Sequence, residues 1–162
     1  MLPQVDLPEV IKHLSWFTNL TQPQLERIAS IASLQSLSSG EILFDEGDRE
    51  DSLYVLLEGQ VTLEIEVPTR GQVNFFTAEA MDIIGWSSMT PIVRQRTARA
   101  RATENSLLLG FNSKLLEQLC DEDHEIGYIV MRRIANTVAN RLLTTRLCLL
   151  DLIAQTAHHE VN

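Results

Sequence analysis

The residues best suited to chemistry lie between Gly85 and Thr97. Gly85 would let the backbone approach a ligand closely, and a single helical turn after it, carrying Ser87 and Ser88, would aim free N–H groups at an anion. Arg96 and Thr97 follow Gly85 by eleven and twelve residues and would close on the same anion with a guanidinium and a hydroxyl. This spacing predicts a binding site for one phosphate-like anion.

Trp86 comes directly after Gly85 and leaves two interpretations open. Its indole could stack on a flat ligand or on the Arg96 guanidinium, or it could fill the space beside the anion and close the pocket. Arg96 has an alternative of its own, because a guanidinium inside a protein needs an anion. A carboxylate such as that of Glu58 or Asp82 could supply one.

Short strands must position these residues. Glycines recur every seven to fourteen residues from Gly40 to Gly85, and Val61–Val67 alternates apolar and polar residues with a period of two. Thr97–Thr103 alternates in the same way, and Ser106–Phe111 would be the last strand. Pro68–Gly71 predicts a hairpin turn. Many short strands with regular turns indicate a jelly-roll barrel over residues 36–111.

Helices are expected before the barrel, over residues 1–35. Thr21 or Gln22 would cap a helix that has Pro23 in its first turn. The apolar positions of that helix fall on one face at helical spacing and are Leu25, Ile28, Ala29 and Ala32.

Helices are also expected after the barrel, over residues 112–156. Asn112 or Ser113 would cap a short helix that ends at Cys120, and Asp121 would begin a long one. A single helix over Ile126–Ile153 would be about 42 Å long, which exceeds a barrel of this size. Its distal half therefore needs a second surface, and a second copy of the chain is the expected partner, although the helix could instead fold back on its own barrel. The expected seam is Ile134, Val138, Leu142, Thr145, Leu149 and Leu152.

Composition narrows the function further. The chain of 162 residues has a net charge of −9, which argues against direct DNA binding because nucleic-acid-binding surfaces are basic. Apolar runs are shorter than the roughly eighteen residues that span a bilayer, and the first fifteen residues lack the pattern of a signal peptide. We therefore expect one cytoplasmic domain over residues 1–162, with no membrane contact and with Cys120 and Cys148 reduced.

Enzyme chemistry is not expected. The four histidines all lie outside residues 37–111, so the predicted barrel has no imidazole for a metal or for acid–base catalysis. Motifs of the GxSxG, P-loop and GxGxxG types are also absent from the sequence. The histidines are His13, His124, His158 and His159.

In their order and spacing, these motifs resemble those of the cyclic-nucleotide-binding domain family, to which catabolite activator proteins and protein kinase A regulatory subunits belong. Gly40–Asp48 and Leu53–Val61 look like its two barrel signatures. Asp82–Gly85 followed by Arg96–Ala98 looks like its phosphate-binding cassette. The resemblance implies an α+β fold, a jelly roll flanked by N-terminal helices and a long C-terminal helix.

The resemblance also implies roles for individual residues. Arg96 and Thr97 would bind the phosphate of a cyclic nucleotide, cAMP or cGMP, and no other cofactor is implied. Ser87 and Ser88 would add N–H groups beside Gly85. On the long helix, Thr145 would contact the base, with Arg146 next to it.

One departure concerns the ribose. The family usually has a glutamate where this chain has Trp86, and that glutamate accepts from the ribose 2′-hydroxyl. Loss of such an acceptor costs ~1–3 kcal/mol, so ordinary cyclic nucleotide binding should be weakened. With a tryptophan at this position, the chain resembles a bacterial subgroup of stand-alone domains of the same fold.

A second departure concerns the end of the chain. Only Ala154–Asn162 follow the expected long helix, so no DNA-reading module is expected and the output would pass through an unknown protein partner or a rearranged dimer. Two functions follow. The first is a sensor of a cyclic nucleotide or similar anion that signals through the long helix. The alternative is a dimeric adaptor whose pocket Trp86 plugs.

Overall fold

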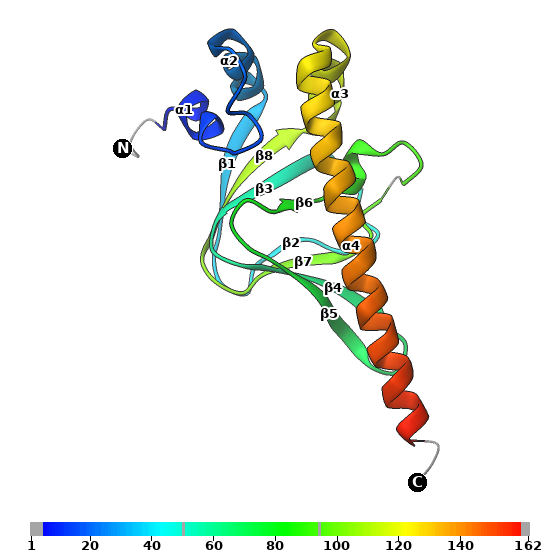
Figure 1. The fold of residues 1–162 in the computed structure, drawn as a ribbon. Coiled ribbons are helices and arrows are strands. Elements are labelled where there is room, and N and C mark those ends of the chain that lie inside the picture. The colour runs from blue at the N-terminus through cyan, green and yellow to red at the C-terminus, as the bar shows by residue number, and fades with distance from the viewer. Residues whose placement is uncertain (1–4, 50, 94, 160–162) are drawn as a thin grey trace.

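Two antiparallel sheets of four strands each form the centre of the molecule (Figure 1). The structure is a computed structural model, which describes residues 5–49, 51–93 and 95–159. One sheet has the strand order β1 (Ala32–Leu37), β8 (Ser106–Asn112), β3 (Ser52–Glu58) and β6 (Ile83–Ile84). The other has the order β2 (Ile42–Phe44), β7 (Arg99–Ala102), β4 (Val61–Val67) and β5 (Gly71–Ala78). The predicted α+β jelly roll is therefore confirmed.

Alternating side chains place one apolar core between the sheets. Val61 and Leu63 of β4 are buried there and lie opposite Ala102 and Ala100 of β7 in the strand register. The alanines leave room for these larger side chains, while Arg99 lies on the outer face of β7 beside Glu64. The strand is shorter than the predicted Thr97–Thr103, because its pairing with β4 extends only over Arg99–Ala102.

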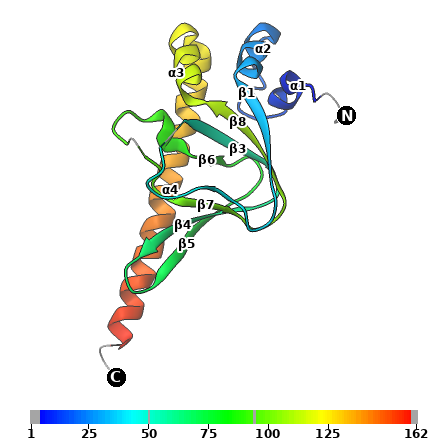
Figure 2. The same ribbon diagram turned by 180° about the vertical axis from the view of Figure 1, so that it is seen from behind.

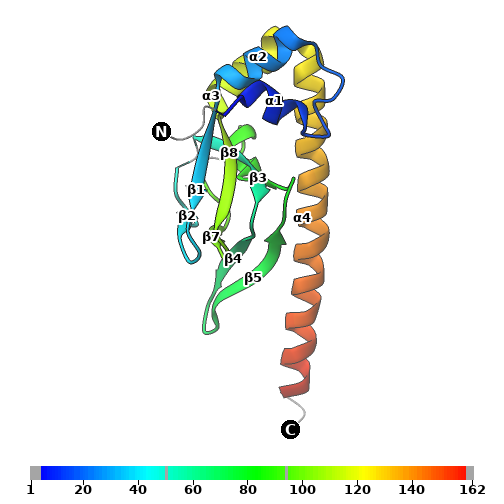
Figure 3. The same cartoon turned by 90° about the vertical axis from the view of Figure 1, so that its left-hand side faces the viewer.

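The Val67–Gly71 turn is tight, as predicted. Thr69 and Gly71 have φ angles of 70° and 78°, in the left-handed region that favours glycine. The turn joins β4 to β5, whose register runs from Val61 opposite Ala78 to Val67 opposite Gly71. This hairpin is the part of the barrel that reaches farthest toward the C-terminal end of the molecule (Figure 3).

A second apolar core joins the β1–β8–β3–β6 sheet to the helices. Leu53, Val55, Leu109 and Phe111 project from β3 and β8 away from the first core. Helices α1 (Leu7–Lys12), α2 (Gln22–Ser30) and α3 (Ser113–Glu122) cover them at one end of the sheets (Figure 2). The strands β3 and β8 are thus buried on both faces.

The N-terminal segment differs from its prediction in one respect. Thr21 caps α2 in a capping box with Gln24, as the sequence indicated, and Leu25, Ile28 and Ala29 are buried. Residues 32–35 are not helical, and Ala32 begins strand β1 instead of continuing the helix. Ala32–Leu37 pairs residue by residue with β8, and this long-range pairing outweighs the helical preference of its alanine and leucines.

Helix α4 (His124–His159) has 36 residues and begins three residues after the predicted start at Asp121. Asp121 still belongs to α3, which Asn112 caps as expected. Asp123 separates the two helices, and its Oδ1 accepts hydrogen bonds from the N–H groups of Glu125 (3.1 Å) and Ile126 (3.2 Å). The first turn of α4 is thus capped by Asp123.

The expected seam along α4 is only partly free. Ile134 is buried in the chain's own core, and Val138 packs against that core, so these two residues cannot form an interface as predicted. Leu142 and Leu149 are 71% and 55% exposed. The proximal half of α4 packs on the domain. The distal half runs beside the β4–β5 hairpin, where Arg70 donates to Gln155 Oε1 at 3.5 Å and to Thr156 Oγ1 at 3.4 Å, and its last turns extend past the sheets (Figure 3). Within the described residues no helix is both long and apolar enough to cross a membrane.

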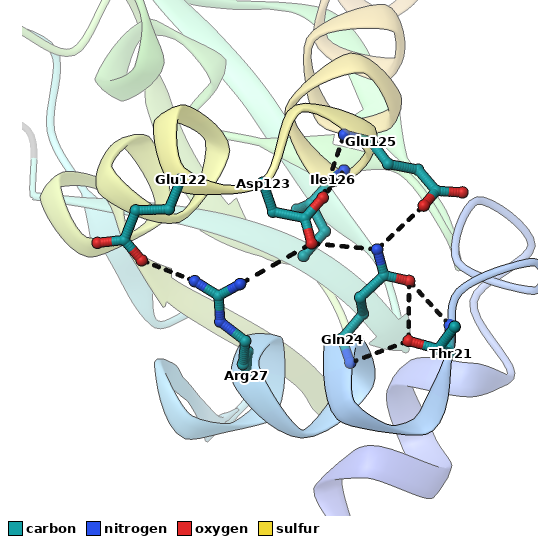
Figure 4. A network of polar contacts seen from close by, with 7 residues as sticks. All are labelled: Thr21, Gln24, Arg27, Glu122, Asp123, Glu125 and Ile126. Carbon is teal, nitrogen blue, oxygen red and sulfur yellow. Dashed lines mark hydrogen bonds and ion pairs between the residues drawn. The ribbon is translucent and has the colours of Figure 1, made fainter.

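A polar network ties α2 to the junction between α3 and α4 (Figure 4). The Nε2 of Gln24 donates to Asp123 Oδ2 and to Glu125 Oε2, both at 3.1 Å. Arg27 forms ion pairs with Glu122 at 2.6 Å and with Asp123 at 3.8 Å. The hydrogen bond from Gln24 is the largest of the effects that lower the pKa of Asp123.

This lowered pKa predicts an acid-dependent loss of stability. The ionised Asp123 stabilises the native state above the carboxylate's unfolded pKa of about 3.9, and this contribution is lost as pH falls through the lower folded pKa. In urea unfolding between pH 7 and pH 2.5, Asp123→Asn should flatten the acid side of the stability profile, and Gln24→Ala should do so partly. Gln22→Ala is the control, because the side-chain amide of Gln22 donates to Glu26 instead. An Asp123→Asn profile parallel to wild type would contradict the network.

Candidate anion-binding site

A cavity of about 360 Å³ lies between the barrel, the short 3-10 helix η1 (Trp86–Met89) and α4. Its volume is near the lower end of the ~300–1,000 Å³ range of small-molecule sites. Strands β2, β4 and β5 supply apolar side chains, the turn at Gly85 supplies backbone, and the middle of α4 closes one side. The lining residues are Phe44, Leu63, Ile65, Phe75, Gly85, Trp86, Ser87, Arg96, Thr97, Ala98, Val138, Arg141, Leu142 and Thr145.

The structure brings most of the predicted site residues to this cavity. Those that line it are Gly85, Trp86, Ser87, Arg96, Thr97 and Thr145. Ser88 does not line it, because its N–H and its hydroxyl both donate to the carbonyl oxygen of Gly85, at 3.2 and 2.9 Å. Arg146 is exposed on α4 and does not line it either, since one residue along a helix turns the side chain by about 100°.

Arg96 is one of the residues that line the cavity, and it is buried, with 3% of the residue exposed. Its Nη2 donates to the Ser52 carbonyl at 2.7 Å and its Nη1 to the Gly85 carbonyl at 3.2 Å. The guanidinium carbon lies 4.2 Å from the ring centroid of Phe44. Asp51, which is a different carboxylate from the two that the sequence suggested, forms an ion pair with it at 4.0 Å.

The Arg96–Asp51 ion pair joins a buried guanidinium to an exposed carboxylate. The Asp51 side chain is 81% exposed to solvent, whereas the Arg96 side chain is 2% exposed. An exposed carboxylate at this distance contributes little. Among the contacts that the described residues make, backbone carbonyls and an aromatic ring also surround the Arg96 guanidinium.

Backbone contacts hold Arg96 in place. Its N–H donates to the Asp48 carbonyl at 2.8 Å, and its carbonyl accepts from the Gly47 N–H at 2.9 Å. Gly85 has a φ angle of 81°, and a Cβ at this position would collide with Nη1 of Arg96. The glycine that the sequence singled out is thus required both for its conformation and for the approach of the guanidinium.

Trp86 is half-buried in the wall, where it packs against the core that joins the sheet to the helices. The cavity persists beside it, so in this conformation Trp86 borders the pocket without filling it. The buried Ser87 accepts hydrogen bonds from the N–H and hydroxyl of Thr90, at 3.1 and 3.0 Å. These two bonds fix the turn that carries Trp86.

Arg141 is a site residue that the sequence analysis missed. It is 6% exposed, its Nη2 donates to the Ile83 carbonyl at 2.9 Å, and its guanidinium carbon lies 3.3 Å from the ring centroid of Phe76. Its Nε is buried and has no hydrogen-bond partner among the described residues. The available signal was its position one helical turn before Thr145, on the same face of α4.

Arg141 remains charged at neutral pH. Burial lowers its pKa to about 10, and the nearby Asp82 carboxylate partly opposes this shift. The cavity therefore has two cationic side chains in its wall, Arg96 and Arg141, together with the hydroxyls of Ser87, Thr97 and Thr145. This arrangement can bind an anion. Within the described ranges, no cluster of three or more His, Cys, Asp and Glu residues could hold a metal ion.

Comparisons with known proteins identify the family and the fold. Residues 34–123, more than half of the chain, match the family model of the cyclic nucleotide-binding domain. A crystal structure from Geobacter metallireducens GS-15, assigned as a cyclic nucleotide-binding protein, is 30% identical with a TM-score of 0.70, over 83% of this chain and 97% of that one. Two further structures are similar in fold.

The first is a cyclic nucleotide-binding domain from Methylobacillus flagellatus KT, 21% identical with a TM-score of 0.74 over 90% of this chain and 81% of that chain. The second is the catabolite activator protein of Thermus thermophilus, 22% identical with a TM-score of 0.66 over 86% of this chain and 62% of that chain. At these identities the likeness concerns the fold.

The contact between Gly85 and Arg96 can be tested by stability. Gly85→Ala must place a Cβ at positive φ, which costs about 1–2 kcal/mol, and must also displace a buried guanidinium. Gly40→Ala is the matched control, because Gly40 has a φ of 90° but nothing within 4 Å of its Cβ position. In urea unfolding, Gly85→Ala should lose about 1 kcal/mol more than Gly40→Ala. Equal losses would contradict the packing of Arg96 on Gly85.

Proposed function

This chain belongs to the cyclic nucleotide-binding domain family, and on that premise we propose that it is a regulatory domain that senses a cyclic nucleotide or a similar phosphate-bearing anion. The observation that carries the proposal is the buried Arg96 guanidinium at the wall of an open cavity. Thr97 and Ser87 would add hydrogen bonds to the anion, and Arg141 would add a second positive charge. The expectation that the chain is not an enzyme stays a prediction.

Signalling would pass through α4, because the helix forms part of the same cavity. Arg141 and Arg133 donate to the carbonyls of Ile83 (2.9 Å) and Met81 (3.3 Å), in the segment that leads to Gly85. A ligand in contact with Arg96 and α4 together would favour one relative position of the two. Such a ligand shifts the equilibrium only by its difference in affinity for the two positions.

The adaptor hypothesis requires Trp86 to close the pocket. A cavity of about 360 Å³ remains with Trp86 in its wall, which favours the sensor. With either function, the output would pass through an unknown protein partner or a rearranged dimer. Direct DNA binding is not proposed for a chain with a net charge of −9, and a cytoplasmic location stays a prediction.

We further propose that two copies pair through the distal half of α4. The exposed apolar residues of this part of the helix are 54–71% exposed, and they are Leu142, Leu143, Leu147, Leu149, Leu150 and Ile153. So much apolar surface on one element is typical of an interface. A homodimer would cover it and would bring two cavities next to one shared helix pair.

Ligand binding can be tested by thermal unfolding and calorimetry with cAMP and cGMP. A ligand at a hundred times its Kd should add about 2.7 kcal/mol to the stability, and Arg96→Ala should abolish that gain. Arg99→Ala is the control, since Arg99 pairs with Asp45 outside the cavity and should leave binding unchanged. Failure of both nucleotides to bind at millimolar concentration would contradict a sensor of cyclic nucleotides.

The dimer can be tested by light scattering. Leu149→Glu should convert a dimer of about 37 kDa, twice the chain mass of 18.3 kDa, to a monomer, because a carboxylate in an apolar interface loses its hydration. Leu115→Glu is the matched control, as Leu115 is a 46% exposed leucine on α3. A wild-type protein that is monomeric at high concentration would refute the interface.

A further inference from the structure

The two cations of the cavity gather beside one short segment of backbone. Arg96 donates to the carbonyl of Gly85, and Arg141 donates to the carbonyl of Ile83, two residues earlier. Because residues this close in a chain lie within several ångströms, both guanidiniums are near the same part of the cavity wall. The site therefore offers one positively charged region.

The rest of the wall is apolar. Away from the two arginines, the large lining side chains are Leu63, Ile65, Phe75, Trp86, Val138 and Leu142. Among the described residues that line the cavity there is no Asp, Glu, Asn, Gln or His. The polar side-chain groups that remain are the hydroxyls of Ser87, Thr97 and Thr145 and the indole N–H of Trp86.

Such a wall is poorly suited to a hydroxylated ligand body. Each sugar hydroxyl or base edge that lost its water without gaining a partner would weaken binding by about tenfold to a hundredfold. An aromatic or branched hydrocarbon body would instead gain affinity from the same aromatic and aliphatic side chains. The negative group of the ligand would still find the two guanidiniums.

We infer that the ligand of this site is an amphipathic anion, with one carboxylate or phosphate head held by Arg96 and Arg141 and an apolar, aromatic or branched body packed against Trp86 and its neighbours. This inference rests on the proposed anion-sensing function and narrows it. The chemical class of the ligand follows from the cavity wall of this chain, in which a cationic region adjoins an apolar one.

Isothermal titration calorimetry on the full chain can separate head from body. The probes are 1-naphthyl phosphate, which has the head and an apolar body, ribose 5-phosphate, which has the head and a hydroxylated body, and 1-naphthol, which has the body without the head. Cyclic AMP is the fourth. The expected Kd of 1-naphthyl phosphate is at least tenfold lower than that of each of the other three.

Each other outcome contradicts a defined claim. If cyclic AMP or ribose 5-phosphate binds as tightly as 1-naphthyl phosphate, the ligand class is wrong and the anion sensor stands. If 1-naphthol binds as tightly as 1-naphthyl phosphate, the guanidiniums do not hold the head, and both claims fail. Both also fail if none of the four binds.

Two variants test the wall itself. Trp86→Glu adds a carboxylate acceptor and should weaken 1-naphthyl phosphate at least tenfold while strengthening cyclic AMP. Leu142→Gln is the second variant, because Leu142 lines the cavity yet is 71% exposed and its replacement should not impair folding. Because Leu142 also belongs to the proposed dimer surface, light scattering must show that the variant keeps the oligomeric state of the wild type. The variant should weaken 1-naphthyl phosphate about threefold and leave ribose 5-phosphate unchanged. Unchanged 1-naphthyl phosphate binding in Leu142→Gln, or in a folded Trp86→Glu, would overturn the inference.

Discussion

The enclosed charge of Arg96 is the constraint from which the site follows. A guanidinium inside a protein is stable only where dipoles, rings or opposite charges replace its water. Here the carbonyls of Ser52 and Gly85 and the ring of Phe44 do so, and they come from β3, from the turn before η1 and from β2. The same contacts that stabilise the barrel therefore position the charge at the cavity, which is why residue 85 must be a glycine.

The sign of the charge inside the cavity is opposite to that of the molecule. The chain as a whole carries −9, whereas the described residues that line the cavity include two arginines and no carboxylate. Because a charge interacts more strongly where water is excluded, the cavity can hold a small anion although the outer surface repels large polyanions. Arg141, whose pKa burial lowers only to about 10, contributes its charge at all physiological pH values.

Local patterns allowed much of the fold and part of the site to be predicted. The alternation of Val61–Val67 and the eleven-residue spacing from Gly85 to Arg96 can both be recognised within a short stretch of sequence. The structure agrees with the predicted strand, and it places Arg96 against Gly85. Strand β1 was missed because its pairing with β8 is a long-range property. Arg141 was missed because helical spacing does not reveal which face of α4 meets the barrel, and the burial of Ile134 was missed for the same reason.

The length of α4 has a mechanical consequence. Its 36 residues make a rod of about 54 Å, capped at Asp123 at one end and in contact with the cavity near its midpoint. If the rod pivots at its capped end, a tilt of about 5° moves the far end by about 5 Å, by the geometry of a rigid helix. A displacement of about 2 Å at the contact of Arg141 with Ile83 is thereby roughly doubled at the far end of the helix, where a neighbouring molecule can detect it without any refolding of the barrel.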